Sequence, residues 1–178
     1  LGLQDFPGQG TALVGLVDAF WDSKGLIEPA RFSQFNGAVM PLASFPKAVY
    51  SAGEPFEADI DLINYSASDI SDGRLSWTLR AADGIAVASG TLPLAKAAMG
   101  ELSRAGHLSA HFGNTAKPEK YTLEVALEGT PYANSWSVWY YPEIQAPESA
   151  SVVQTASVAE AVAALEQGKK VLLSPRPD

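Results

Sequence analysis

The first residues of the chain carry polar and aromatic side chains of the types that bind small polar ligands. Asp5 follows a strand-like stretch at residues 1–4, and Gln9, Trp21 and Asp22 follow within a loop rich in glycine and aromatic residues. In a (β/α)8 barrel, ligand-binding groups lie where strands end and their loops begin. The spacing therefore predicts either the edge of a ligand-binding site or a loop that packs against the following domain.

A second group of candidate residues lies in the aromatic segment from Ser135 to Tyr141. Side chains alternate across a strand, so Trp136 would share one face with Val138 while Trp139 and Tyr141 point the other way. We expect the first face to pack in a core. Trp139 and Tyr141 could form an aromatic platform for a sugar, but packing against a neighbouring domain is the favoured interpretation.

The acidic residues and histidines lack the pattern of a catalytic or metal site. Glu57, Asp59 and Asp61 alternate along one expected strand, as acids on a solvated face do, whereas an acid–base pair needs two contrasting environments. His107 and His111 would lie about 13 Å apart along a strand, too far to bind one metal ion. No GxSxG, P-loop or dinucleotide-binding motif is present. The sequence therefore predicts no catalytic residue, no metal site and no cofactor in this chain.

Composition argues against several classes of partner. The chain has 178 residues, with 12 Lys and Arg against 20 Asp and Glu, and a formal net charge of −8. Nucleic acids and anionic membranes need a basic surface, so neither is expected to bind. The sequence has no apolar run of about 18 residues, as a transmembrane helix would need, and no signal-peptide pattern at its first residues. Without cysteine it has no disulfide or thiolate site.

The region from residue 46 to 143 has the period of two that is typical of β-strands. Apolar residues alternate with acids over residues 56–62, and similar alternation recurs at residues 75–79, 121–127 and 135–141. Asp83-Gly84 predicts a tight hairpin turn, and weaker strands fit near residues 48–50 and 106–112. Several short strands without long helices predict a mainly β fold, an immunoglobulin-like antiparallel β-sandwich.

The regions on either side differ from this pattern. Residues 1–45 are irregular apart from a short helix expected from about Pro29 to Phe35, in which proline suits the first helical position. Residues 144–151 have the composition of a linker.

Residues 152–178 predict one β-α-β unit. Its helix has a capping box at Ser157 and Glu160 and a C-terminal stop at Gly168. A single unit of this kind cannot bury both of its faces. We therefore expect both ends of the chain to be fragments of neighbouring α/β domains.

Four segments carry a resemblance to a known family: LQDFPGQGTALVG (residues 3–15), DAFWDSKG (18–25), GEPFEAD (53–59) and NSWSVWYYP (134–142). They resemble bacterial, Bacteroidetes-type β-galactosidase-like glycoside hydrolases related to family 2. In such proteins the first segment ends the catalytic barrel and the second follows it. The last two open and close an immunoglobulin-like sandwich.

The resemblance implies a domain order and an activity for a parent enzyme. Residues 1–45 would be the remnant of the end of a catalytic (β/α)8 barrel, 46–143 the sandwich, 144–151 a linker and 152–178 the start of a further domain. The parent would hydrolyse β-linked sugars such as β-galactosides by the retaining mechanism, which uses two carboxylates. In the family both glutamates lie on earlier barrel strands, so this chain alone is expected to be an inactive scaffold.

The resemblance also implies that Asp5, Gln9, Trp21 and Asp22 help to line the sugar subsite. The expected partners are the remaining domains of the parent and carbohydrate, and a periplasmic or extracellular location is expected for the parent. Two alternatives stay open: a carbohydrate-binding module with Trp139 and Tyr141 as its platform, or a surface protein-interaction domain with no enzymatic parent.

Overall fold

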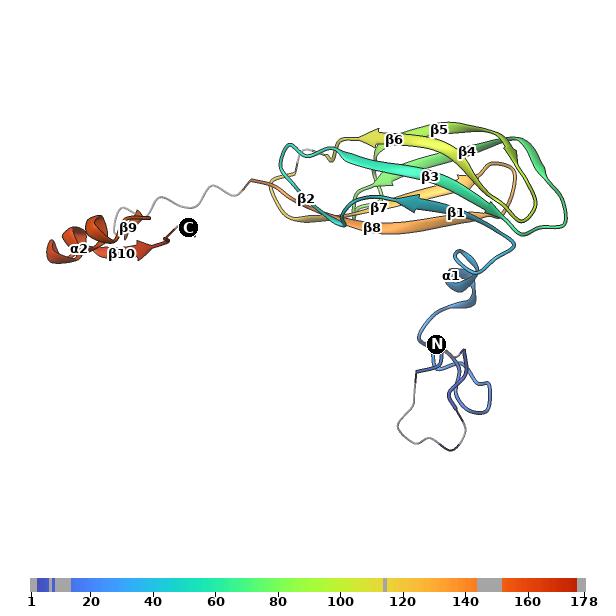
Figure 1. The fold of residues 1–178 in the computed structure, drawn as a ribbon, viewed down its shortest axis with the longest axis horizontal. Coiled ribbons are helices and arrows are strands. Elements are labelled where there is room, and N and C mark those ends of the chain that lie inside the picture. The colour runs from blue at the N-terminus through green and yellow to red at the C-terminus, as the bar shows by residue number, and fades with distance from the viewer. Residues whose placement is uncertain (1–2, 7, 9–13, 114, 144–151, 176–178) are drawn as a thin grey trace. The chain divides into compact units, whose positions relative to one another are not determined.

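The computed structural model describes residues 3–6, 8, 14–113, 115–143 and 152–175. The chain divides into two compact units, residues 1–143 and residues 144–178, and each is described by itself. The larger unit is mainly β, as the sequence pattern predicts (Figure 1). Within the described part of the chain, no helix is long and apolar enough to span a membrane.

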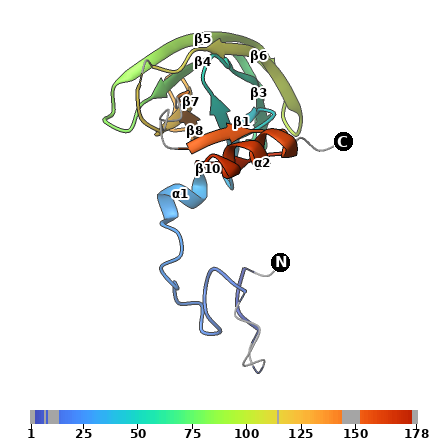
Figure 2. The ribbon, with the colours of Figure 1, turned by 90° about the vertical axis from the view of Figure 1, so that its left-hand side faces the viewer.

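Two sheets build the larger unit. The first is antiparallel and consists of β1 (Val39–Ser44), β3 (Phe56–Asn64) and β6 (Leu102–Ala110), in that order. The second consists, in order, of β2 (Val49–Ser51), β8 (Ala133–Tyr141), β7 (Glu119–Leu127), β4 (Ile70–Arg80) and β5 (Ala86–Ala97). Only its β2–β8 pair is parallel. Because β5 packs against β6 and β1 against β8, the sheets curl around one interior (Figure 2).

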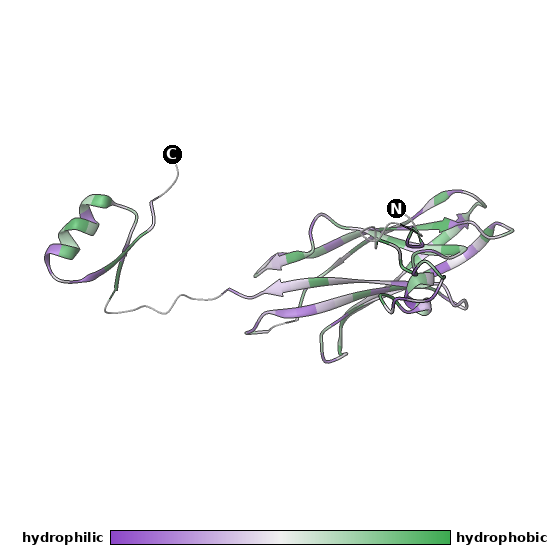
Figure 3. Ribbon diagram, turned by 90° about the horizontal axis from the view of Figure 1, so that it is seen from below, coloured by the Kyte–Doolittle hydropathy of each residue, from purple (hydrophilic) through white to green (hydrophobic). Residues whose placement is uncertain are grey.

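The core lies between the two sheets, where the period of two predicts it. On β3, Phe56, Ala58, Ile60 and Leu62 are buried, and the acids between them lie on the outer face. The alternation of hydrophobic and hydrophilic residues along the strands can be followed in Figure 3. The second sheet contributes the buried side chains of Leu75, Trp77, Leu79, Tyr121, Leu123, Val125, Leu127 and Val138. The expected antiparallel β-sandwich is therefore confirmed.

Two strands differ from the sequence expectation. β1 begins at Val39, inside the segment placed before the sandwich, and pairs with β3 from Val39↔Asn64 to Ser44↔Asp59. Its Pro41 weakens the strand signal, but proline is tolerated on an edge strand. The pattern after Asp83-Gly84 predicts a strand over residues 85–89 only, whereas β5 runs from Ala86 to Ala97 and passes through Gly90. A Cβ on Gly90 would lie 2.8 Å from the Trp77 indole nitrogen, so this glycine makes room for a core side chain.

The hairpin between β4 and β5 follows the expected turn chemistry. Gly84 has φ +85°, a conformation that glycine adopts without steric cost. Its N–H donates to the Ala81 carbonyl at 3.0 Å, and the Ile85 N–H donates to the Asp83 carboxylate at 2.9 Å. The Asp-Gly pair therefore determines where β4 turns back.

The smaller unit contains β9 (Val152–Thr155), α2 (Val158–Glu166) and β10 (Lys170–Leu173), with β9 and β10 parallel. Gly168, with φ +74°, donates to the Leu165 carbonyl, and Lys169 donates to the Ala164 carbonyl. These two bonds are the Schellman arrangement that ends a helix. The predicted linker at residues 144–151 lies outside the described residues.

The start of α2 differs in one detail from a capping box. Ser157 Oγ accepts the Glu160 N–H at 3.4 Å, as expected. Glu160, however, accepts the Thr155 hydroxyl at 2.5 Å, and Thr155 Oγ1 in turn accepts the Ser157 N–H at 3.0 Å. Thr155 therefore relays the contact that the glutamate was expected to make directly.

Candidate functional site

The N-terminal segment, residues 3–35, is organised around the carboxylate of Asp5, which is 4% exposed. Asp5 Oδ1 accepts the Gly15 N–H at 2.7 Å, and Lys24 Nζ lies 2.9 Å from Oδ2. The hydrogen bond from Lys24, followed by that from Gly15, holds the pKa of Asp5 below its ordinary value of 3.8. The ionised carboxylate thus links three parts of the segment.

Backbone contacts bring these parts together. Asp5 N–H donates to the Val17 carbonyl at 3.0 Å, and Leu16 N–H donates to the Leu3 carbonyl at 2.8 Å. Val17 also forms an antiparallel bridge with Ser23. A Cβ on Gly15 would lie 2.4 Å from the Asp5 backbone nitrogen, so only glycine allows this close approach.

A tight turn at residues 18–22 presents two aromatic side chains. Asp18 Oδ1 accepts the N–H groups of Phe20 at 2.8 Å and of Asp22 at 3.0 Å. Phe20 is 84% exposed and Trp21 is 65% exposed. Trp21 also has φ +70°, a left-handed conformation that costs a bulky residue about 1–2 kcal/mol. The structure therefore places Trp21 and Asp22 in one exposed turn whose geometry depends on Asp18.

The four N-terminal residues singled out in the sequence have different positions. Asp5 is buried in its ion pair, Trp21 and Asp22 lie in the exposed turn, and Gln9 lies outside the described residues. Asp18, which holds the turn, was not among them. Its signal in the sequence is an aspartate placed two and four residues before the amides that it accepts.

An apolar hollow of about 250 Å³ lies within the N-terminal segment. It is lined by Leu3, Leu16, Val17, Ser23, Ile27, Pro29 and Phe32. No acidic side chain lines it, so this hollow has no group for acid–base chemistry.

The helix α1 (Pro29–Ser33) lies near the end of this segment, before the first strand of the sandwich. Phe32 and Phe35 pack edge to face with ring centroids 5.3 Å apart. The Arg31 guanidinium donates to Ser135 Oγ and to the Ser135 carbonyl, both at 3.0 Å. Arg31 thus provides hydrogen bonds to β8 at Ser135, outside the part of β8 that pairs with β2.

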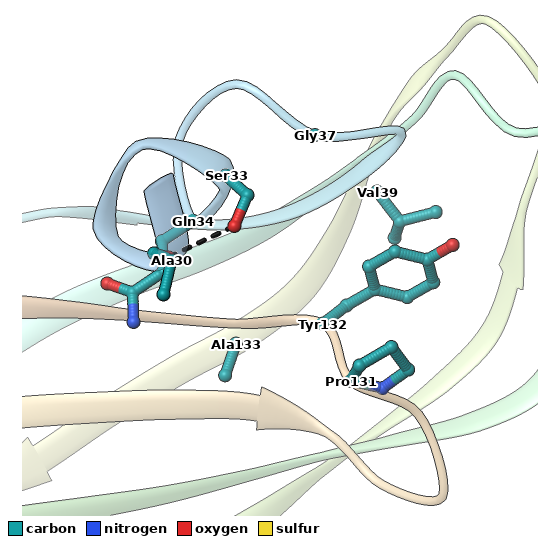
Figure 4. A pocket seen from close by; sticks show the side chains of 8 residues that line it. All are labelled: Ala30, Ser33, Gln34, Gly37, Val39, Pro131, Tyr132 and Ala133. Atoms are coloured by element: carbon teal, nitrogen blue, oxygen red, sulfur yellow. Dashed lines mark hydrogen bonds between the residues drawn. The ribbon is translucent and has the colours of Figure 1, made fainter. Parts of the chain in front are cut away.

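A second hollow, of about 380 Å³, lies between α1 and the turn before β8 (Figure 4). Figure 4 shows the Tyr132 ring beside Val39 and the Ser33 hydroxyl donating to the Ala30 carbonyl, at 3.0 Å. The remaining lining residues are Gln34, Gly37, Pro131 and Ala133. The lining has no carboxylate and no histidine, so it does not form an acid–base site.

The aromatic residues of β8 divide between the two faces of its sheet. Val138 is fully buried, and Trp136 and Tyr140 pack against the core. Trp139 and Tyr141 are 39% and 46% exposed on the outer face. The alternation expected for this strand is therefore observed, and two aromatic side chains are left on the surface.

The acids of β3 form surface ion pairs. Asp59 binds Arg104 and lies 2.8 Å from His107 Nδ1, and Asp61 lies 3.7 Å from Arg104. The contacts to His107 and then Arg104 lower the pKa of Asp59. Among the described residues, no group of His, Cys, Asp or Glu could hold a metal ion.

One sequence family matches the chain. The model described as "Domain of unknown function (DUF8488)" matches residues 54–142, which is half of the 178 residues. The chain belongs to this family. The DUF8488 match extends from just before β3 to just after β8, so β1 and β2 precede it. Comparison with curated proteins finds no match.

Several solved structures are similar to the DUF8488 chain at low identity. An alkylpurine DNA glycosylase from Pseudomonas fluorescens, bound to DNA with an abasic-site analogue, has 13% identity and a TM-score of 0.42, covering 64% of this chain and 33% of that one. A β-glucuronidase from Parabacteroides merdae has 13% identity and a TM-score of 0.37, covering 60% and 14%. A putative β-galactosidase from Bacteroides fragilis has 12% identity and a TM-score of 0.35, covering 79% and 25%.

These similarities concern parts of larger proteins. The DUF8488 chain spans about a third or less of the length of each of them. The similar structures include glycoside hydrolases, one of them a β-glucuronidase of family 2. Similarity at this level gives no information on activity.

Proposed function

We propose that this chain is a non-catalytic part of a larger glycoside hydrolase that cleaves β-linked sugars such as β-galactosides. In this role the sandwich positions the neighbouring domains. The observation that supports the proposal best is the construction of the N-terminal segment, which encloses the ion-paired Asp5 but exposes Phe6, Phe20, Trp21 and Leu26 by 65%, 84%, 65% and 65%. Large apolar side chains are usually inside a protein, so a segment of this kind suits contact with a further domain.

The resemblance of residues 1–25 to the end of a catalytic barrel supports the same role. We assign Trp21 and Asp22, with Gln9, to the rim of the parent's sugar subsite. Asp5 belongs to the same subsite as the residue that holds the loop, because its carboxylate is engaged by Lys24 and Gly15.

The catalytic carboxylates are proposed to come from outside this chain. A retaining enzyme holds its two carboxyl groups about 5–5.5 Å apart across the substrate. The two hollows near α1 are lined by no acid, and a third, beside Tyr141, has Glu143 as the one acid in its lining. The chain by itself should therefore lack turnover.

An assay of the purified chain with p-nitrophenyl β-D-galactoside tests this expectation. We expect no release of nitrophenol above the buffer blank. Saturable turnover that follows the protein through purification would contradict the proposal. The reading frame before the Leu1 codon gives a second test, because it should encode barrel strands with two glutamates; an unrelated sequence or a stop codon there would also contradict it.

The subsite assignment is tested in that longer protein. Trp21→Ala should lower kcat/KM by about tenfold or more, because a ring in contact with substrate is lost. Phe20→Ala, in the same turn, is the matched control and should leave kcat/KM within about threefold of the parent's. Equal kcat/KM in the parent and in Trp21→Ala would remove Trp21 from the subsite.

One rival role is supported by the same exposed side chains. A surface interaction domain without an enzymatic parent could use Phe20 and Trp21 to pair with another protein. Sedimentation of the purified chain separates the two ideas. A dimer that the double variant Phe20→Ala, Trp21→Ala abolishes would favour the interaction domain.

A further inference from the structure

The outer face of the five-stranded sheet carries an aromatic surface near the end of β8. The strand register places Val49 of β2, Trp139 of β8 and Lys120 of β7 in one row. Tyr141 lies two residues further along β8, opposite Ser51. Val49, Trp139 and Tyr141 are 52%, 39% and 46% exposed. Three large side chains thus share one accessible face.

The surroundings of these rings are polar, and their charged residues are Lys120, Arg80 and Glu143. The next row contains Ser137, Thr122 and Arg80. Serine and threonine hydroxyls both donate and accept hydrogen bonds. The Arg80 guanidinium is engaged by Glu124 at 2.8 Å, so the charge in this row has a partner within the protein.

The two ends of the surface differ in shape. Beside Tyr141 lies a hollow of about 400 Å³ lined by Ser51, Ala52, Pro142 and Glu143 as well as by Tyr141 itself. At the other end, the Arg31 guanidinium donates hydrogen bonds to the hydroxyl and the carbonyl of Ser135. From Tyr141 to Ser137 the strand rises about 13 Å, enough for an extended ligand of more than one ring.

We propose that this surface, which we call the β8 platform (Val49, Trp139, Tyr141, Ser137 and Thr122), binds a neutral oligosaccharide. The faces of Trp139 and Tyr141 would contact the C–H faces of pyranose rings, and Ser137 and Thr122 would exchange hydrogen bonds with the sugar hydroxyls. This site goes beyond the proposed scaffold role and does not depend on it.

The composition of the β8 platform favours a sugar over other occupants. A stable protein interface uses about 20–30 residues on each side, whereas the exposed apolar group here consists of three large side chains. An anionic ligand would find a single cation, Lys120, in the Trp139 row, and a cationic one would find Glu143 beside Tyr141. A neutral polyol matches both the rings and the hydroxyls.

Titration of the full chain with cellohexaose, xylohexaose and mannohexaose tests the proposal. We expect saturable binding of at least one of them, with a change in tryptophan emission. Trp139→Ala and Tyr141→Ala should each weaken binding about tenfold or more, since a contact worth about 1.4 kcal/mol is a factor of ten. Tyr65→Ala is the matched control, because Tyr65 is a 62% exposed aromatic residue outside the β8 platform, and this variant should bind as the unsubstituted chain does.

Folding of each variant is checked by near-UV circular dichroism and by its melting temperature. If Trp139→Ala does not fold, Tyr141→Ala and Trp139→Phe carry the test, and Trp139→Phe should retain part of the affinity. Absence of binding at millimolar concentrations of all three hexasaccharides would overturn the proposal. So would unchanged affinity in a folded Trp139→Ala, tighter binding of oligogalacturonate, or a dimer in solution that Trp139→Ala separates.

Discussion

The β-sandwich and the N-terminal segment use similar residues in opposite ways. In the sandwich, Phe56 and Tyr121 are completely buried. In the N-terminal segment, Phe20 and Trp21 are 84% and 65% exposed, and the buried group is the carboxylate of Asp5. Both regions are rich in aromatic side chains, so aromatic content alone does not decide which region has a core.

The two regions are stabilised by different interactions. Burial of apolar surface is the main favourable contribution to folding, and the sandwich has a continuous set of buried residues. The N-terminal segment depends on hydrogen bonds and one ion pair, each of modest net value. We therefore expect the segment to open locally at a lower free energy than the sandwich.

The smaller unit resembles the N-terminal segment in having little buried apolar surface. Among the residues that the structure describes in this unit, Ala161 and Ala164 are the buried apolar ones, whereas Val158, Val162 and Leu165 of α2 are exposed. The two alanines bury little surface. This unit too should open before the sandwich does.

The largest effect that distinguishes the two regions is expected for phenylalanine truncation. Phe56→Ala should lower the free energy of unfolding by about 3–5 kcal/mol, because it leaves a cavity in the core. The control Phe20→Ala should stay within about 0.5 kcal/mol, as exposed substitutions usually do. Urea unfolding followed by near-UV circular dichroism measures both. Equal losses would contradict the division into a core and an uncovered segment.

A smaller loss is expected where the core meets the backbone. Gly90→Ala would place a Cβ 2.8 Å from the Trp77 indole nitrogen and should cost about 1–3 kcal/mol through overpacking. In Gly73→Ala the nearest atom would be a leucine methyl at 3.3 Å, so its cost should be smaller. The same urea experiment compares them, and a reversed order would show that the Trp77 contact does not limit the packing.

Tyr50→Phe is expected to stabilise the protein, in contrast to the two substitutions above. The Tyr50 hydroxyl is buried and has no hydrogen-bond partner among the described residues, so removing it should raise the free energy of unfolding by about 1 kcal/mol. In the control, Tyr121→Phe, a hydroxyl that donates to Glu119 at 3.1 Å is lost, and stability should fall by about 1 kcal/mol. Melting temperatures show whether each variant is more or less stable than the unsubstituted chain. Destabilisation by both variants would contradict the expected difference between the two hydroxyls.

The smallest effect on the whole protein is expected from Asp5→Asn. It should speed amide hydrogen exchange at Gly15 several-fold, because the ion pair with Lys24 is lost, and leave sandwich amides unchanged. The pKa of Asp5 is lowered, so its stabilising contribution is present above the ordinary value of 3.8 and is lost as the pH falls through the lowered pKa. Lowering the pH should therefore open the N-terminal segment of the unsubstituted chain. Asp61→Asn is the control. A Gly15 exchange rate that changes neither with Asp5→Asn nor with acidic pH, beyond the intrinsic pH dependence of amide exchange, would contradict the prediction.

The sequence predicts the elements whose signals are local. The alternation in residues 56–62 determines which face of β3 is buried, Asp83-Gly84 marks the hairpin, and Ser157 with Gly168 marks the ends of α2. It also predicts that Trp139 and Tyr141 share a face. Each of these features depends on residues within a few positions of one another.

The tertiary structure decided what depends on distant residues. Only the folded chain pairs Asp5 with Lys24, places Arg31 against Ser135 and adds β1 to the sheet beside β3. Trp21 takes its left-handed conformation in a turn closed by Asp18. Periodicity in the sequence selects a face for each strand, but contacts across long separations depend on how the strands are arranged. For that reason the local pattern predicts most of the strands and their buried faces, whereas the exposure of Phe20 and Trp21 and the burial of Asp5 follow only from the folded arrangement of distant residues.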